Sequence, residues 1–181
     1  TPCTDKNFTF VRFLPEYMNK IILTFDVEEF DVPIAFGQKI DFEKQIEVST
    51  IGLQNVLTLI ENHHLRCTFF TTAKYALEQT ELTRIIARTH EIASHGYAHS
   101  SFKIIDLKKS KETLEGLLDK KIDGYRMPGH APVDQKEIEA AGYTYQSSMN
   151  PTWIRGRYNH LLKPRIPFKT GNIWNIPTSV T

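Results

Sequence analysis

The segment "ILTFDVEEFD", residues 22–31, passes from an apolar run directly into a cluster of acids. Asp26, Glu28, Glu29 and Asp31 fall within six positions. Burying an unpaired carboxylate is costly or shifts its pKa, so such a cluster needs water, cationic partners or a metal. We therefore expect positive groups close to these acids in the folded chain.

Two histidines are the first candidates for that partnership. His95 and His99 stand four apart in "ASHGYAHSS", directly after a short apolar segment. On a helical turn this spacing puts two imidazoles on one side, which suits a metal. Two imidazoles and one carboxylate would leave positions open for water and substrate, as in catalytic zinc sites, and would free another acid for proton transfer. The competing interpretation is a pair of surface histidines at the start of a helix.

Strand periodicity divides the acids into two sets. Asp26 and Glu28 are two residues apart, so in a continuing strand both face one side while Val27 faces the other. We expect Glu29 and Asp31 to be loop charges, although Glu29 would replace Glu28 if the strand ended early. The metal ligand and the proton acceptor should thus come from the first pair.

A second region, "GYRMPGHAP", supplies a cation and a stiff turn. Arg126 follows an apolar stretch and could hold a catalytic carboxylate as an oriented ion pair. The alternative is a surface arginine at a strand end. We predict that Pro128 and His130 line the substrate pocket, and that Trp153, in "NPTWIRGRYNH", stacks on a sugar ring unless it belongs to a structural loop.

The apolar pattern predicts strands that alternate with helices. We expect strands at 20–25, 66–71, 91–94 and 122–126, a fifth from Tyr143 and a sixth near the end of the chain. Helices are expected after Ser49 or Thr50, around 82–86, over 107–118 and over 134–142. This order predicts parallel strands joined by right-handed crossovers, with the polar residues after each strand meeting at one face.

Chain length limits the barrel that these strands could form. A complete eight-stranded barrel typically needs about 250 residues, and this chain has 181. We therefore predict an α/β fold of the distorted or incomplete (β/α) barrel type. Residues 1–17 are expected to be an N-terminal extension, and 18–181 one domain that stops short of its full C-terminal end.

Composition excludes few partners outright. The chain carries 22 Lys plus Arg against 21 Asp plus Glu, a net charge of +1, which gives no reason to expect nucleic acid as the main partner. No segment approaches the roughly 20 apolar residues of a membrane span. No signal peptide is visible, so the cytoplasm and the cell envelope both stay open, as does the oligomeric state.

Three motifs in register resemble one known family. "TFDVE", "SHGYAHS" and "YRMPGH" resemble the polysaccharide deacetylase family, the NodB-like, chitooligosaccharide-deacetylase-like members of carbohydrate esterase family 4. The likeness covers about residues 21–148. It implies a distorted (β/α) barrel that binds a divalent metal, usually zinc, and hydrolyses the N-acetyl groups of an N-acetylglucosamine-containing polysaccharide or of the glycan of peptidoglycan.

The resemblance also implies roles for individual residues. Asp26 would be the general base, oriented by Arg126, and His95 and His99 would be metal ligands. The family's second aspartate, which binds the metal, is replaced by Val27, so the first motif resembles an Asp-any-Glu subgroup in which Glu28 takes over as ligand. The metal would polarise the amide carbonyl and activate a water, whose proton Asp26 would take.

Two departures keep other functions open. Gln146 stands where the family usually has an aspartate, and the Leu-any-His motif that supplies the general acid does not occur in the chain. One alternative is a C–N hydrolase of small amides or cyclic ureides on the same scaffold. Another is a catalytically weakened sugar-binding module that keeps the metal.

Overall fold

The structure is a computed structural model that describes residues 21–155 and 158–179. The expected N-terminal extension, residues 1–17, and the start of the first expected strand at Lys20 lie outside the described residues. Within the described part, none of the helices has the length and apolar content needed to cross a bilayer.

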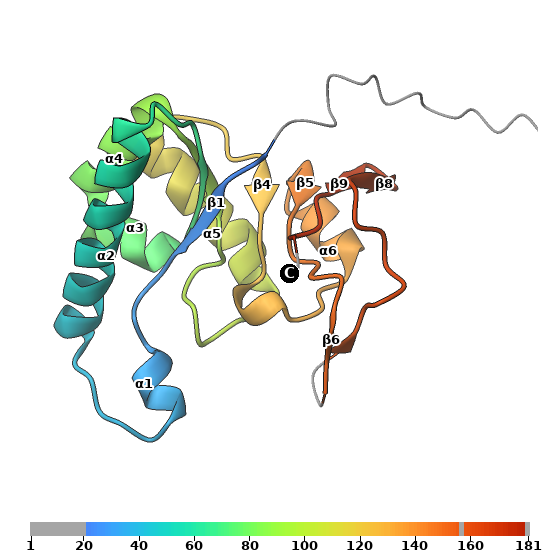
Figure 1. Cartoon of the computed structure of the whole chain (residues 1–181), viewed down its shortest axis with the longest axis horizontal. Helices are drawn as coiled ribbons and strands as arrows, with labels where there is room; N and C mark the ends of the chain where they lie inside the picture. Colours follow the sequence, from blue (N-terminus) through green and yellow to red (C-terminus); the bar gives the residue numbers. More distant parts are fainter. Residues whose placement is uncertain (1–20, 156–157, 180–181) are drawn as a thin grey trace, which may run out of the picture.

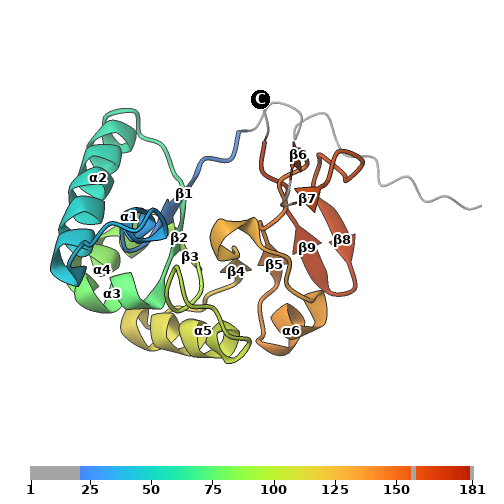
Figure 2. The same cartoon turned by 90° about the horizontal axis from the view of Figure 1, so that it is seen from below.

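The architecture is a curved, mostly parallel sheet with helices along its outer side (Figures 1 and 2). Seven strands form the sheet in the order β1-β2-β3-β4-β5-β9-β8, and all neighbours are parallel except β8 and β9. The strands are β1 (Thr24–Val27), β2 (Thr68–Thr71), β3 (Glu91–Ser94), β4 (Gly124–Tyr125), β5 (Tyr145–Gln146), β8 (Phe168–Thr170) and β9 (Ile173–Asn175). A separate antiparallel pair joins β6 (Trp153–Ile154) to β7 (Tyr158–Asn159).

This topology confirms the predicted fold class. In the described part of the chain, β1 and β8 each pair on one side only, so the sheet is open and the barrel is incomplete. The six parallel strands match the six expected positions, although β1 begins four residues later than predicted, at Thr24. That shift places Asp26 inside the strand instead of beyond its end.

Helices α2 to α6 cover the outer, convex side of the sheet (Figure 2). The helices are α1 (Val32–Ala35), α2 (Phe42–Asn62), α3 (Ala73–Glu78), α4 (Thr80–Thr89), α5 (Ile105–Leu118) and α6 (Gln135–Ala140), with a 3-10 turn, η2 (Pro128–His130). The core between the two layers is apolar, with Phe69 of β2, Tyr75 of α3 and Leu114 of α5 fully buried. The sequence pattern missed the short elements α1 and α3, because four to six residues give too little periodicity to detect.

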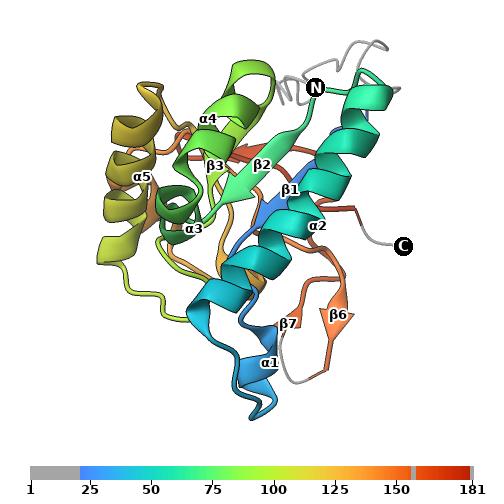
Figure 3. The same cartoon turned by 90° about the vertical axis from the view of Figure 1, so that its left-hand side faces the viewer.

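The longest helix begins earlier than predicted. We expected it after Ser49 or Thr50, but α2 starts at Phe42, after an extended Asp41. Ile46 is buried one heptad before Leu53, so the apolar face continues across Ser49. The Ser49 hydroxyl donates instead to the backbone carbonyl of Glu28, which fixes α2 beside the end of β1 (Figure 3).

Candidate metal centre

Strand β1 places two acids on the inner face of the sheet. Val27 is buried in the core beneath the helices, so its neighbours in the strand point the opposite way. Asp26 pairs in register with Phe70 of β2, and Glu28 follows one residue beyond the strand. The expected alternation of these three residues is therefore present.

The two histidines come from the loop after β3, and not from a helical turn as predicted. His95 follows the last strand residue and is 2% exposed, and His99 lies in a non-helical stretch before α5. Gly96 between them has a φ of +80°, in the left-handed region, which turns the chain back. The rings lie nearly parallel, with centroids 6.2 Å apart and an interplanar angle of 23°.

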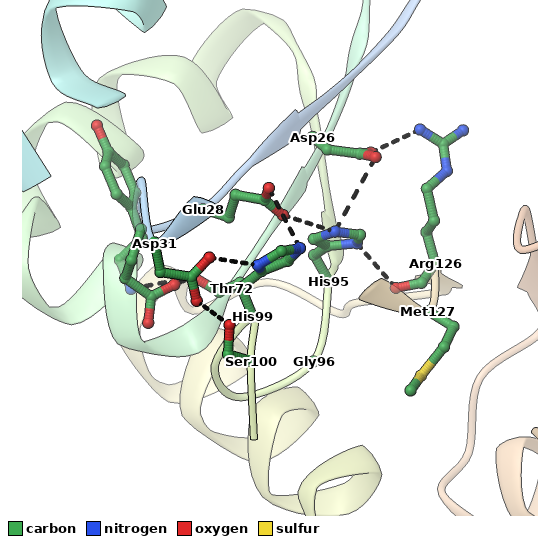
Figure 4. Close-up of polar contacts among 12 residues, drawn as sticks. Asp26, Glu28, Asp31, Thr72, His95, Gly96, His99, Ser100, Arg126 and Met127 are labelled. Carbon is green, nitrogen blue, oxygen red and sulfur yellow. Dashed lines mark hydrogen bonds and ion pairs between the residues drawn. The ribbon is translucent and has the colours of Figure 1, made fainter. Parts of the chain in front are cut away.

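Glu28 stands between the two imidazoles (Figure 4). Its Oε2 lies 2.9 Å from His95 Nε2, and its Oε1 lies 3.4 Å from His99 Nε2. One ligand atom from each of the three residues can be chosen so that all lie within 4.8 Å of one another. Around a tetrahedral zinc with ligands at about 2.0–2.2 Å, ligand atoms are about 3.4 Å apart, so the spacing is of the right size.

The hydrogen bonds behind the rings decide which ring atoms face Glu28. His95 Nδ1 lies 2.9 Å from the backbone carbonyl of Arg126, and His99 Nδ1 lies 2.7 Å from Asp31 Oδ1. Each Nδ1 must carry hydrogen to make these bonds, so in the neutral rings each Nε2 presents a lone pair. Glu28 Oε2 is buried and has no hydrogen-bond partner. Lone pairs that converge on a buried, unpartnered carboxylate oxygen fit a cation, and two imidazoles with one carboxylate fit zinc.

Asp26 is held beside this point by Arg126. Arg126 Nη1 donates to Asp26 Oδ1 at 2.6 Å, while Asp26 Oδ2 lies 4.0 Å from His95 Nε2. The guanidinium also donates to Thr24 Oγ1, Ser147 Oγ and the Ser147 carbonyl, and it stacks on Phe70. Arg126 is 4% exposed and contacts Asp26 through Oδ1, so this ion pair leaves Oδ2 available.

The supporting partners Thr24 and Ser147 were missed by sequence reasoning. A signal for Thr24 existed, because period-two alternation puts it on the same face as Asp26. Ser147 follows β5 and meets Arg126 only through the fold.

The two remaining acids are not simple loop charges, and that expectation was wrong. Glu29 is 2% exposed and Asp31 is 8% exposed. Glu29 accepts a hydrogen bond from Thr72 Oγ1 at 2.8 Å and lies 3.6 Å from Lys74 Nζ. Asp31 contacts His99 and Ser100. Each acid of the cluster thus has a partner from another strand end, which explains how so many carboxylates can lie together.

The predicted substrate-binding residues are placed differently from one another. Pro128 is buried, and a Cβ on Gly96 would lie 3.6 Å from its Cγ, so it packs against the histidine loop. His130 is half-buried, with Nδ1 3.1 Å from the Ser148 carbonyl, and burial lowers its pKa. Trp153 is exposed on the β6–β7 hairpin, away from the seven-stranded sheet. Their contact with substrate stays a prediction.

Gln146, the departure noted in the sequence, bonds within the sheet. Its side-chain amide donates to Asn175 Oδ1 at 3.0 Å, across to β9.

A cleft of about 260 Å³ runs between β1 and α2, lined by Asp26, Glu28 and Ser49 among others. The residues that line this cleft include neither the two histidines nor Arg126, so the cleft reaches the two acids from the side of α2.

A comparison with models of known protein families identifies the family of this chain. The family model described as polysaccharide deacetylase matches residues 18–146, well over half of the 181 residues. The chain belongs to the polysaccharide deacetylase family. The match runs from before β1 to the end of β5 and includes Asp26, Glu28, His95, His99 and Arg126.

Solved structures share the fold of this polysaccharide deacetylase domain. A protein assigned as a polysaccharide deacetylase from Mycobacterium smegmatis gives a TM-score of 0.66 at 24% identity, over 87% of this chain and 58% of its own. One so assigned from Pseudomonas aeruginosa PAO1 gives 0.62 at 16% identity, over 88% and 61%. The PuuE allantoinase gives 0.61 at 16% identity, over 88% and 61%. The chain thus spans 58–61% of the length of these three structures. No curated protein matches the sequence.

Proposed function

We propose that this chain is a divalent-metal-dependent hydrolase that removes N-acetyl groups from an N-acetylglucosamine-containing polysaccharide or from the glycan of peptidoglycan. The observation that carries the proposal is the convergence of Glu28, His95 and His99 on one point, with Glu28 Oε2 buried and without a hydrogen bond. Zinc is the metal that this donor set favours. Membership of the polysaccharide deacetylase family supports the same chemistry.

The residues divide the work between binding a cation and moving a proton. Glu28, His95 and His99 would hold the metal, which when bound supplies Lewis acidity toward the amide carbonyl and toward water. Asp26 is the proton acceptor, and it acts through Oδ2 because Arg126 occupies Oδ1. The side chain of Asp26 is 33% exposed, so a water can reach it. The ion pair with Arg126 keeps Asp26 aimed at the site.

A second candidate is a C–N hydrolase of small amides or cyclic ureides. It rests on the fold shared with the allantoinase and on the long connection 28–41, which carries α1 to the mouth of the site. This helix and the residue after it carry three exposed apolar side chains, Val32, Ile34 and Phe36. In this candidate function they would narrow the entrance of the site, so that only a small substrate could enter. A polymer requires the cleft to stay open.

Metal content and activity of matched variants test the proposal. We expect about one zinc per chain, retained in Asp26→Asn, and zinc affinity at least about 100-fold lower in Glu28→Gln, because even second-sphere changes cost 10–100-fold. Glu29→Gln is the control, since the neighbouring residue faces Thr72 and Lys74 and not the histidines.

Activity separates the candidates. Release of acetate from chitooligosaccharides, reduced about 10²–10⁴-fold in Asp26→Asn, would support the deacetylase. Turnover of allantoin without acetate release would favour the second candidate. Zinc loss in Asp26→Asn with retention in Glu28→Gln would show that base and ligand are exchanged. Zinc binding without turnover of either substrate would favour the sugar-binding module.

A further inference from the structure

Asp31 is a buried carboxylate that the proposed reaction does not yet use. It directly precedes α1, but its side chain makes no capping bond to that helix. Instead Oδ1 lies 2.7 Å from His99 Nδ1, and Oδ2 accepts a hydrogen bond from Ser100 Oγ (Figure 4). Both oxygens are therefore committed to the loop that carries the second histidine.

The contact with Asp31 determines which nitrogen of His99 is free. A neutral imidazole carries one hydrogen on either Nδ1 or Nε2, and an acceptor beside one nitrogen fixes the hydrogen there. Asp31 can only accept from Nδ1–H, which leaves the Nε2 lone pair directed at Glu28, 3.4 Å away. Without this acceptor, His99 could carry its hydrogen on Nε2 and offer no lone pair to a cation.

The two histidines are positioned by different means. His95 Nδ1 donates to a backbone carbonyl, that of Arg126, and its ring is 2% exposed. The side chain of His99 is 21% exposed and relies on a carboxylate. A single substitution at Asp31 therefore changes the support of one histidine and leaves that of the other in place.

We infer that Asp31 is a positioning residue that fixes the tautomer and orientation of His99 for metal binding. This inference rests on the proposed metal site. A carboxylate behind a metal-binding imidazole also makes the ring a stronger ligand, and loss of such a partner typically lowers metal affinity about 10–100-fold. Ser100 holds the second oxygen of Asp31 and so keeps the first aimed at His99.

The test compares Asp31→Ala and Asp31→Asn with Ser100→Ala, which removes a bond to Asp31 without touching the ring. The ¹⁵N shifts of the histidine rings in metal-free protein report the tautomer directly. We expect His99 to be the Nδ1–H form in the unaltered chain and in Asp31→Asn, whose amide oxygen can still accept from Nδ1–H, and a mixture in Asp31→Ala, while His95 is unchanged in all. Zinc affinity, by chelator competition, should fall about 10–100-fold in Asp31→Ala and less in Asp31→Asn and Ser100→Ala.

The two kinds of failure give different results. If His99 keeps the same tautomer in Asp31→Ala and zinc affinity stays within about twofold of the unaltered chain, the role of Asp31 is overturned. If Asp31→Ala does not fold, Asp31→Leu, which fills the space of the carboxylate without an acceptor, decides the question by the same ring shifts. If the unaltered chain binds no zinc, the proposed function fails, while the tautomer comparison still supports or overturns the role of Asp31.

Discussion

The two ends of the parallel sheet use charge in opposite ways. At the carboxyl end, Glu28, Asp26 and Asp31 contact residues from other strand ends, and atoms that could bind a cation face one another. At the amino end, a larger cleft of about 500 Å³ is lined by Arg66, Arg88, Lys120 and Lys121 together with other residues. The volume of the clefts alone would therefore place the functional site at the amino end, away from the candidate metal centre.

Two of the cations at the amino end, Lys120 and Lys121, have local partners. Lys120 Nζ donates to the Ala87 carbonyl near the end of α4, and Lys121 pairs with Asp123 at 2.7 Å. Helix C-termini carry partial negative charge, and α4 and α5 both end there. Within residues 21–155 and 158–179, the one group of three that could hold a metal lies at the other end. The candidate metal site is therefore recognised by ligand atoms that converge on one point, and not by the size of a cleft or the number of charged residues that line it.

The largest difference in stability between the two ends is expected when Arg126 is replaced. We expect Arg126→Met to lower the free energy of unfolding by about 2–3 kcal/mol, because Thr24 and Ser147 lose the donor that pairs them, while Asp26, whose side chain is 33% exposed, is partly solvated. Urea unfolding measures the change. Lys121→Gln, which breaks an exposed pair at the amino end, should not alter the transition measurably. Equal effects of the two variants would contradict the difference between the ends.

A smaller effect is expected at the glycine between the two histidines. Gly96→Ala should cost about 1–2 kcal/mol of stability, because an alanine resists a φ in the left-handed region, and Gly96 has φ +80°. The new Cβ itself has room, since its nearest neighbour is Pro128 Cγ at 3.6 Å.

The control is Gly116→Ala in α5, whose ideal Cβ meets nothing within 4 Å. Alanine is the better helix former, so this variant should gain about 0.5–1 kcal/mol. Thermal unfolding compares both variants. Shifts of the same sign would show that the turn at Gly96 is not under conformational constraint.

The smallest effect concerns pH at the amino end. Burial lowers the pKa of His90 below its usual 6.5. The unfolded chain then binds a proton at higher pH than the folded one, so His90 costs nothing above about pH 7.5 and destabilises as pH falls through about 6.5. We expect His90→Asn, which keeps an acceptor for the Cys67 N–H, to reduce the loss of stability between about pH 7.5 and 5.5 by roughly 1 kcal/mol or less. Unfolding curves at both pH values check this, and a steeper loss in the variant would reverse the sign.

Much of the fold followed from local patterns. The order of the parallel strands, the open sheet and the position of β3 at Glu91–Ser94 were predicted correctly, because short apolar runs between helical segments leave few topologies. The predicted start of α2 was wrong. Serine is a common helix cap, but the Ser49 hydroxyl donates to the backbone carbonyl of Glu28, which lies after β1. No local pattern encodes that contact.

The environment of the acids shows the same limit. Their number and spacing were readable, and so was the need for positive partners. Strand alternation separated Glu28 from Glu29, but it could not name their partners: Glu28 lies between two imidazoles, and Glu29 is turned toward Thr72 and Lys74. Asp31 was expected to be a loop charge, because its partners His99 and Ser100 are almost 70 residues further along the chain.

The sequence by itself determined the residue types of this member of the polysaccharide deacetylase family, the alternation of its elements and the side of β1 on which Asp26 and Glu28 lie. These follow from covalent chemistry and from the periodicity of strands and helices. The tertiary structure alone decided which nitrogen of each histidine is free, which oxygen of Asp26 is occupied and which acids are buried. Those properties depend on hydrogen bonds between residues that are distant in the chain, and only folding brings their partners within reach.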